Sequence, residues 1–305
     1  MALKNSKCFF LFHLSMSMLF IFFPPPRKLN HIRKFIAMEK RMKKGDVLNI
    51  LTCGNVRFCD TIRPMSKKEL QLIRSLKNKK ERNEHGLFVV EGVKAVKELL
   101  ASHIKVHSVY AVKKFEGIES PAVLVTDGEF AKISSMKSPQ GILACARKPS
   151  YTLTIAELRN ELTLALCGIR DPGNMGSIVR TADWFGIKNI ICSEDTCDIY
   201  NPKAIAAAMG SAFKVKTHYI NLENFLSQAQ TAKIPIYASV IDGENIYHSK
   251  LSEYGIILIG NESRGVPGGN SGAADIKISI PRFGSAESLN AALACAVLCA
   301  EFRRR

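Results

Sequence analysis

The 305-residue sequence lacks several residue patterns that would assign it to a common class of protein. None of its nine cysteines stands in the paired C-x-x-C spacing of a zinc site, which argues against a structural zinc domain. The sequence has neither a complete G-x-G-x-x-G run nor a G-K-[ST] ending, so both common nucleotide-binding motifs are weak at best. It also shows no internal repeat.

The apolar run near the start of the sequence is shorter than a typical membrane-spanning helix. This run, residues 8–23, falls below the roughly 20 residues that a spanning helix needs. Lysines before the run and three prolines after it resemble a signal peptide or a short membrane anchor, but no small-residue cleavage site follows. We interpret residues 1–64 as a poorly structured or non-domain extension, and expect no membrane association. A membrane-tethered protein is an alternative that depends on this run alone. The possible translation starts are Met1, Met38, Met42 and Met65.

The chain is strongly basic, with a formal net charge of +16. Residues 1–64 hold 12 Lys and Arg against 3 Asp and Glu, so the rest of the chain carries about +7. A positive balance favours polyanionic partners, either nucleic acid or an anionic membrane surface. Several of the cysteines lie in apolar runs, and we interpret them as reduced thiols of a cytoplasmic protein rather than as a disulfide framework.

Well-patterned sequence begins at Met65. A capping box, Ser66 with Glu69, predicts a helix that ends near Gly86. Strands are then expected at 87–92, 105–112, 122–126 and 141–147, with helices at 93–102 and 127–136. We expect residues 65–149 to form a small α/β domain.

A second series of strands and helices occupies residues 150–305, after a linker with a short helix. Strands are expected at 163–169, 188–193, 214–220, 234–241, 256–259 and 276–281. Helices are expected at 177–185, 201–213 and 222–232, and a closing helix from Glu287. This alternation predicts a parallel sheet covered by helices on both faces.

Three polar loops follow strands of this sheet, where ligands bind in open parallel sheets. The first is "GIRDPGNMGSIVRTADWFG", in which Pro172 and Gly173 predict a turn and Asn174 and Gly176 precede a helix carrying Arg180. An ordinary connection with a solvated arginine is the alternative. A nucleotide-phosphate loop is another, because glycines at a helix start suit anions, but its glycine pattern is incomplete.

The second loop is "LIGNESRGVP", where Gly260 and Gly265 permit close backbone approach and Glu262 and Arg264 supply opposite charges. It could instead be a flexible surface loop with a salt bridge. The third is "ISIPRFGSAESLNAALA", with Ser288 and Asn290 in the first turn of an apolar helix, where both residue types often serve as caps. Together the loops offer donors and acceptors without a metal-ligand set, a Ser-His-Asp triad or a Cys-His pair. We therefore expect a site that holds and orients its ligands, with the reactive group supplied by a cofactor.

In this order, the three stretches resemble the signature motifs of the SpoU (TrmH-like) family of SPOUT RNA 2′-O-ribose methyltransferases. Residues 66–148 resemble the small substrate-binding domain that many members carry. The resemblance covers most of residues 65–305 and implies a parallel sheet with a C-terminal trefoil knot, an exception to unknotted topology. It further implies S-adenosyl-L-methionine as cofactor, held largely by backbone groups at Gly260, Ile280 and Leu289. A Cβ at Gly260 would then obstruct the adenosyl moiety.

The resemblance implies methyl transfer to an RNA ribose 2′-hydroxyl, a poor nucleophile that must lose its proton. The resemblance implies that Arg180 helps to remove that proton with the assistance of an RNA phosphate, because an arginine is ordinarily a very weak base. Asn174 would position Arg180, while Glu262, Ser288 and Asn290 would orient the loops and the ribose. Two departures from the usual motifs, Ser263-Arg264 in the second loop and Ala-Ala after Asn290 in the third, could affect substrate fit.

The expected partners are RNA and a second copy of the chain. The small domain favours 23S ribosomal RNA, while transfer RNA, or a non-catalytic RNA-binding protein on the same fold, remains an alternative. The family implies a homodimer, and small residues on the closing helix (Ala291, Ala292, Ala294 and Ala296) suit close packing. The cationic helix 67–82 is a candidate phosphate contact or a solvated charged face. Its basic residues are Lys67, Lys68, Arg74, Lys77, Lys79, Lys80 and Arg82.

Overall fold

The structure, a computed structural model, describes residues 63–261, 265–266, 272 and 274–304. The expected extension 1–64 therefore lies almost wholly outside the described residues. Those that are described fall in one compact unit. Among them, no helix combines the length and the apolar character needed to cross a membrane.

The first sheet has four strands in the order β1-β4-β2-β3. Strand β4 pairs antiparallel with both β1 and β2, whereas β2 and β3 are parallel. Its strands are β1 (Leu87–Glu91), β2 (Val106–Ala111), β3 (Val123–Leu124) and β4 (Ile142–Arg147). Its helices are α3 (Lys67–Ser75), α4 (Lys79–His85), α5 (Val93–Leu100) and α6 (Asp127–Ile133).

The second sheet has six strands in the order β10-β8-β9-β5-β6-β7, and every pair in it is parallel. Its strands are β5 (Leu162–Leu166), β6 (Asn189–Cys192), β7 (Lys216–Tyr219), β8 (Ile236–Asn245), β9 (Gly255–Ile259) and β10 (Ile276–Ser279). The central strand β5 is buried throughout, as a strand covered on both faces must be. The predicted parallel sheet with a preceding α/β segment is confirmed.

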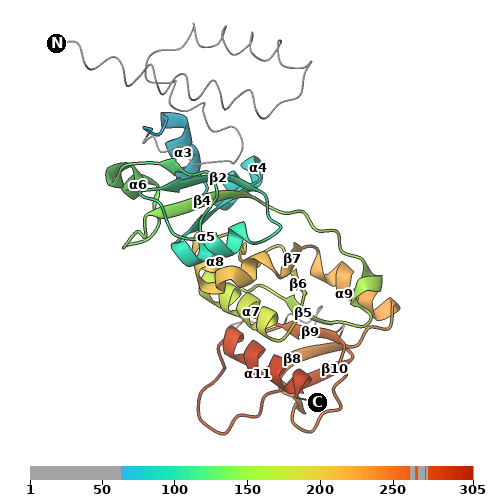
Figure 1. Cartoon of the computed structure of the whole chain (residues 1–305). Helices are drawn as coiled ribbons and strands as arrows, with labels where there is room; N and C mark the ends of the chain where they lie inside the picture. The colour runs from blue at the N-terminus through green and yellow to red at the C-terminus, as the bar shows by residue number, and fades with distance from the viewer. Residues whose placement is uncertain (1–62, 262–264, 267–271, 273, 305) are drawn as a thin grey trace, which may run out of the picture. The chain divides into compact units, whose positions relative to one another are not determined.

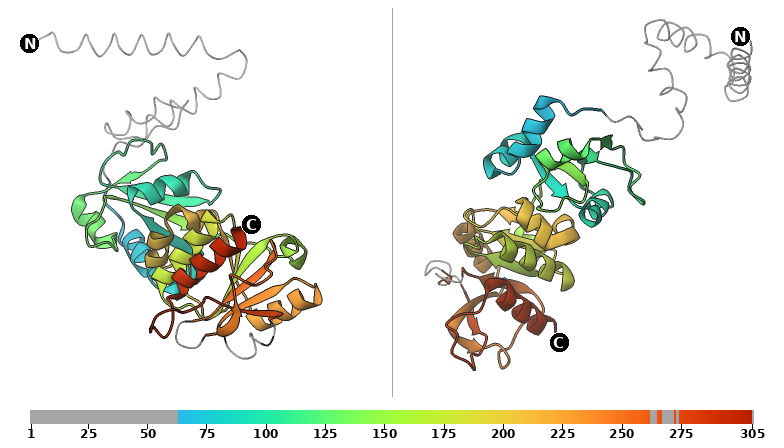
Figure 2. Two further views of the ribbon diagram at one scale, coloured as in Figure 1. Left: turned by 90° about the horizontal axis from the view of Figure 1, so that it is seen from below. Right: turned by 90° about the vertical axis from the view of Figure 1, so that its left-hand side faces the viewer.

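Helices cover the second sheet on both faces (Figures 1 and 2). One face packs against α7 (Pro172–Trp184), α8 (Pro202–Ala208) and α11 (Ala291–Arg303). The other packs against α9 (Leu222–Thr231). The described residues also include two short 3-10 helices, η2 (Ile155–Leu158) and η3 (Met209–Phe213).

Several helices differ from the sequence predictions in their boundaries, and three of these differences concern candidate functional residues. The cationic helix is two helices, because Asn78 takes an extended conformation and caps α4. Helix α7 begins at Pro172 rather than after Gly176, since Asp171 caps it and a proline suits a first turn. The closing helix begins at Ala291, so Ser288 precedes it and Asn290 is its cap.

Helix α4 contacts the second sheet through Arg82, which the sequence placed among the candidate phosphate contacts. That prediction is wrong for this residue. Arg82 is 1% exposed and pairs with Asp198 at 2.8 Å, in the loop that follows β6. Its Nη1 also donates to the carbonyls of Leu76 and Lys77. A guanidinium with these partners stabilises the fold and does not face an RNA backbone.

Candidate functional site

The first polar loop turns directly into helix α7. The Asp171 side chain accepts a hydrogen bond from the backbone N–H of Asn174 at 2.8 Å, which fixes the start of the helix. Gly176 lies one turn further on, where an added Cβ would sit 2.5 Å from the carbonyl oxygen of Ala204 in α8. Gly176 is therefore a packing glycine that lets α7 and α8 approach closely, and not part of a phosphate loop.

Asn261, which the sequence analysis did not single out, joins the first two loops. Its Nδ2 donates to the carbonyl oxygen of Gly168, just past β5, at 3.0 Å. The N–H of Gly168 in turn donates to Ser193 Oγ, in the loop after β6, at 2.9 Å. The sequence signal was the position of Asn261, two residues beyond the end of a buried strand.

Gly260 lies where the second loop returns on itself. The N–H of Gly265 donates to the carbonyl of Asn261 at 2.7 Å, and Gly265 has a φ of +62°. An added Cβ on Gly260 would lie 2.2 Å from the carbonyl carbon of Gly265 and 2.5 Å from the nitrogen of Val266. The chain itself thus excludes a side chain at this position. Glu262 lies outside the described residues.

The third loop contacts the first through two asparagines. The Asn290 Nδ2 donates to Asn174 Oδ1 at 3.0 Å, and its Oδ1 accepts from the N–H groups of Ala292 and Leu293 at the start of α11. Ser288 and Leu289 precede this cap and are exposed, while Ile280 is half-buried against the core. One side chain therefore caps a helix and connects two of the three loops.

Helices α7 and α11 lie side by side and run in the same direction. Asn290 meets Asn174 where both helices begin, and Arg303 Nε donates to the carbonyl of Phe185 at 3.1 Å where both end. Buried small residues, among them Ala182, Ala291 and Cys295, fill the core beside them. The two hydrogen bonds hold the first and third loops in a fixed register.

Arg180 is exposed and lies about 9 Å along the helix axis from Asn174, six residues away. It lines a cleft of about 350 Å³ that also includes Lys94, Glu98 and Trp184. Asp183, beside it, accepts a hydrogen bond from Ser211 Oγ at 2.7 Å. The cleft thus brings basic and acidic side chains of α5 and α7 together around the guanidinium.

In the described part of the chain, no group of three or more His, Cys, Asp or Glu side chains could hold a metal ion. Amide side chains and the main chain of Gly260 lie together at the carboxyl ends of β5, β9 and β10. That arrangement defines the class: a parallel α/β protein that binds a small ligand where these strand ends meet.

Comparison with known proteins assigns the family. Residues 161–300 match the model of the SpoU rRNA Methylase family, and residues 67–144 match that of the MRM3-like substrate binding domain. The chain belongs to the SpoU rRNA methylase family, as the sequence motifs predicted.

Individual relatives span most of the chain. The 23S rRNA (guanosine(2553)-2'-O)-methyltransferase RlmP of Bacillus subtilis is 29% identical over 237 residues, which cover 75% of this chain and 94% of that protein. A TrmH-family protein structure from Porphyromonas gingivalis is 31% identical with a TM-score of 0.72, covering 80% of this chain and 100% of that one. An AdoMet-bound rRNA methyltransferase structure from Sinorhizobium meliloti is 27% identical with a TM-score of 0.71, covering 80% and 97%.

Proposed function

We propose that this protein transfers a methyl group from S-adenosyl-L-methionine to a ribose 2′-hydroxyl of RNA, with 23S ribosomal RNA as the substrate. The hydrogen bond between Asn290 and Asn174 carries the proposal, because it joins the first and third loops. The hydrogen bond from Asn261 to Gly168 joins the second loop to the first. The names of the relatives from Bacillus subtilis and Sinorhizobium meliloti support both the reaction and the RNA.

The residues present fit the proposed cofactor. Gly260, directly after β9, lies so close to the main chain of Gly265 and Val266 that it has no room for a side chain, which leaves its own main chain bare at the end of this strand. Ile280 and the 46% exposed Leu289 offer apolar surface suited to an adenine ring. Gly260, Ile280 and Leu289 would hold the cofactor, which supplies an electrophilic methyl group.

The polar residues act on the ribose. Arg180 would draw the proton from the 2′-hydroxyl together with an RNA phosphate, because a guanidinium alone is a very weak base. Asn174 and Asn290 fix the loops relative to each other, and Glu262 and Ser288 orient the ribose. Holding the hydroxyl in line with the methyl group supplies much of the rate enhancement.

We propose that the active unit is a homodimer in which each site is completed by the partner. Trp184 on α7 is 85% exposed and Leu293 on α11 is 58% exposed, on two helices that lie side by side. Exposed apolar side chains on two adjacent helices can mark a surface that a partner covers. A partner's α7 would then carry its Arg180 toward the loops of this chain.

The two sheets are proposed to have different functions. We propose that residues 65–149 bind RNA and residues 150–305 carry catalysis. The lysines of α3 and α4 that remain exposed, including Lys67, Lys68 and Lys80, can contact phosphates without reading sequence. None of the cysteines that the structure describes is in a disulfide, which suits the reducing cytoplasm.

The test is a map of 2′-O-methylation in RNA from cells with and without the gene. We expect one site to be lost, and to be restored by the wild type and by Arg159→Ala, an exposed arginine on a different element. Arg180→Ala should not restore it, while calorimetry should show that this variant still binds S-adenosyl-L-methionine. A lost site in transfer RNA would correct the substrate. Unchanged methylation, or no binding of the cofactor by the wild type, would refute the proposed methyltransferase activity.

A further inference from the structure

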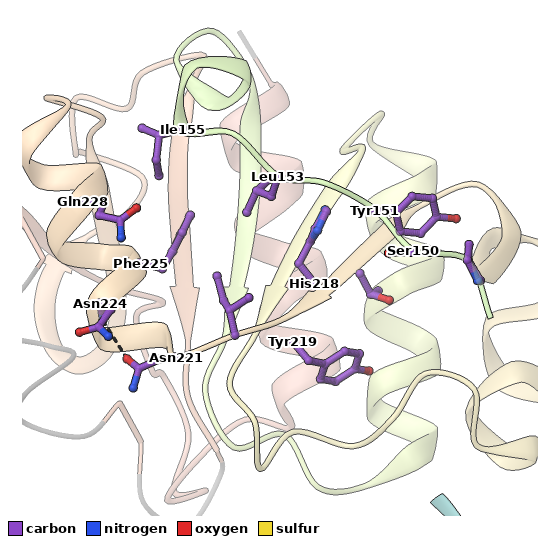
Figure 3. A pocket seen from close by; sticks show the side chains of 13 residues that line it. Ser150, Tyr151, Leu153, Ile155, His218, Tyr219, Asn221, Asn224, Phe225 and Gln228 are labelled. Atoms are coloured by element: carbon purple, nitrogen blue, oxygen red, sulfur yellow. Dashed lines mark hydrogen bonds between the residues drawn. The ribbon is translucent and has the colours of Figure 1, made fainter. Parts of the chain in front are cut away.

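A second cavity lies on the flank of the parallel sheet, away from the three loops (Figure 3). It has a volume of about 560 Å³ and lies over β7, one of the two edge strands of that sheet. Helix α9 forms one side, with Asn224, Phe225 and Gln228, and the segment 149–155 forms the other. Its volume falls within the range of sites for small ligands or single nucleotides.

The lining of this flank cavity is polar but uncharged. Of the thirteen described residues that line it, none carries a carboxylate or an ammonium group. Amide side chains come from Asn221, Asn224 and Gln228, and rings from Tyr151 and Phe225. Burial lowers the pKa of His218, which favours the neutral form of its imidazole. Neutral donors and acceptors beside aromatic rings are the groups that recognise an unpaired nucleobase.

Tyr151 is held in place within the flank cavity. Its hydroxyl lies 3.4 Å from His103 Nε2, and its ring meets the ring of His218 edge-on, with centroids 6.1 Å apart. The imidazole of His218 is fixed in turn by Asn189 Oδ1 at 3.1 Å. A tyrosine held on a connecting segment, with restricted rotation, is a suitable platform for stacking, because little side-chain entropy remains to be lost.

Two lysines that do not line the flank cavity lie beside aromatic rings that do. The Nζ of Lys216 lies 5.9 Å from the centroid of the Tyr151 ring. The Nζ of Lys79, at the start of α4, lies 5.9 Å from the centroid of Tyr219, a lining residue. Basic side chains at the rim and a neutral aromatic interior match the charge pattern of a nucleic acid strand, with phosphates outside and a base inside.

We propose that the flank cavity binds an unstacked base of the substrate RNA, a few nucleotides from the ribose that is methylated. The proposal rests on the proposed function. Strand β7 is three strands from β9 in the sheet, or about 14 Å at the usual spacing. The segment 149–155 also connects the two sheets, so the flank cavity lies between the part proposed to bind RNA and the part proposed to carry catalysis.

The experiment compares binding of 23S ribosomal RNA transcripts, and of short single-stranded RNA, by full-length variants. Tyr151→Leu removes the ring, Tyr151→Phe keeps it, and the pair Asn224→Ala/Gln228→Ala removes two amides. Gln230→Ala is the matched control, an exposed glutamine on the same helix that does not line the cavity. We expect Tyr151→Leu and the amide pair to weaken binding and raise KM about tenfold, while Gln230→Ala stays near the wild type. Tyr151→Phe keeps the ring but loses the contact with His103, so its binding should fall between those of the wild type and Tyr151→Leu.

Crosslinking locates the base directly. RNA carrying 4-thiouridine in its unpaired positions should crosslink to the peptide that contains Tyr151, and Tyr151→Leu should reduce that yield. Equal RNA affinity of all variants, with no crosslink on residues 149–155 or α9, would overturn the inference even if methylation is normal. Absent methylation or cofactor binding in the wild type would instead remove the proposed function, so the two failures are distinguishable.

Discussion

Arg82 and Asp198 form a buried ion pair that connects the first sheet's helix α4 to the loop after β6 in the second sheet. Asp198 Oδ1 also accepts from the N–H of Tyr200, whose ring packs on Phe88 with centroids 4.6 Å apart. The loop after β6 continues this link, because the N–H of Cys197 donates to the carbonyl of Ile169 in the first polar loop. The helix that precedes the small sheet is thus connected, contact by contact, to the candidate site.

Removing the cation of this pair should destabilise the protein strongly. We expect Arg82→Met to lower the free energy of unfolding by about 3–5 kcal/mol, because Asp198 would remain buried without a counter-charge. The double variant Arg82→Met/Asp198→Leu should recover much of this loss, since two apolar side chains can replace a buried pair.

The matched control is Arg63→Met, which breaks the exposed Arg63–Glu69 pair. It should cost less than about 1 kcal/mol. Urea unfolding of the four proteins measures these differences. If Arg82→Met cost no more than Arg63→Met, the assigned structural role of Arg82 would be wrong.

Replacing Asn290 separates its capping role from its contact with Asn174. Asn290→Ala should lower the free energy of unfolding by about 1–2 kcal/mol, because α11 loses its cap. Asn290→Asp should retain most of the stability, since aspartate caps equally well and the Asn174 amide can turn to donate to it.

The double variant Asn174→Asp/Asn290→Asp should lose more stability than the sum of its two single variants, because two carboxylates would then face each other at the distance of the present hydrogen bond. Simple additivity in urea titrations would show that the two side chains do not interact.

Gly260→Ala should weaken cofactor binding by about tenfold or more. The new Cβ would meet the main chain of Gly265 and Val266, so the second loop must move. Gly265→Asn is the control, because space is open at that position and asparagine tolerates a left-handed φ. Calorimetry with S-adenosyl-L-methionine distinguishes them, and equal affinities for both variants would show that the shape of this loop is unrelated to the cofactor.

The pH dependence of stability should report on Glu69. The hydrogen bond from Arg63, with further ones from Ser66, lowers the pKa of this carboxyl from 4.5 to about 2. Because the folded pKa is depressed, the stability that Glu69 contributes is present above pH 4.5 and is lost as the pH falls from 4.5 toward 2. Acid titration of unfolding should show a shallower slope in this window for Glu69→Gln than for wild type. Identical slopes would contradict the assignment.

The strands of the parallel sheet could be predicted closely, because apolar runs such as 256–259 are continuous and polar residues bound them. Helix starts were less accurate. Helix α7 includes Pro172 and Gly173, residues that usually signal a turn, because Asp171 caps them. A helix cap is a hydrogen bond from a backbone N–H of the first turn to a side chain, and it forms only when the backbone has the right geometry. A pattern of hydrophobic residues carries no information about that geometry.

The role of Arg82 could not be predicted from its neighbours. It lies among exposed lysines on a cationic stretch, and its buried ion-pair partner, Asp198, lies far along the chain. The same limit applies to Asn261, whose partner Gly168 belongs to another loop. Local spacing identifies which residues can be polar at a strand end, and only the packing of the sheet decides which of them meet.

A single charged substitution on the exposed apolar surface of α7 or α11 should dissociate the proposed homodimer. Trp184→Glu or Leu293→Glu would place a carboxylate in the interface, and we expect the dimer dissociation constant to rise about thirtyfold or more, as for other central anchor residues. The control is Ile241→Glu, since Ile241 is 74% exposed but lies on β8, on a different part of the fold. Sedimentation equilibrium across a range of concentrations should find the wild type and Ile241→Glu as dimers, and the other two variants as monomers. A dimer that survives both substitutions would mean that another surface forms it. A monomeric wild type would mean that Arg180 acts within its own chain.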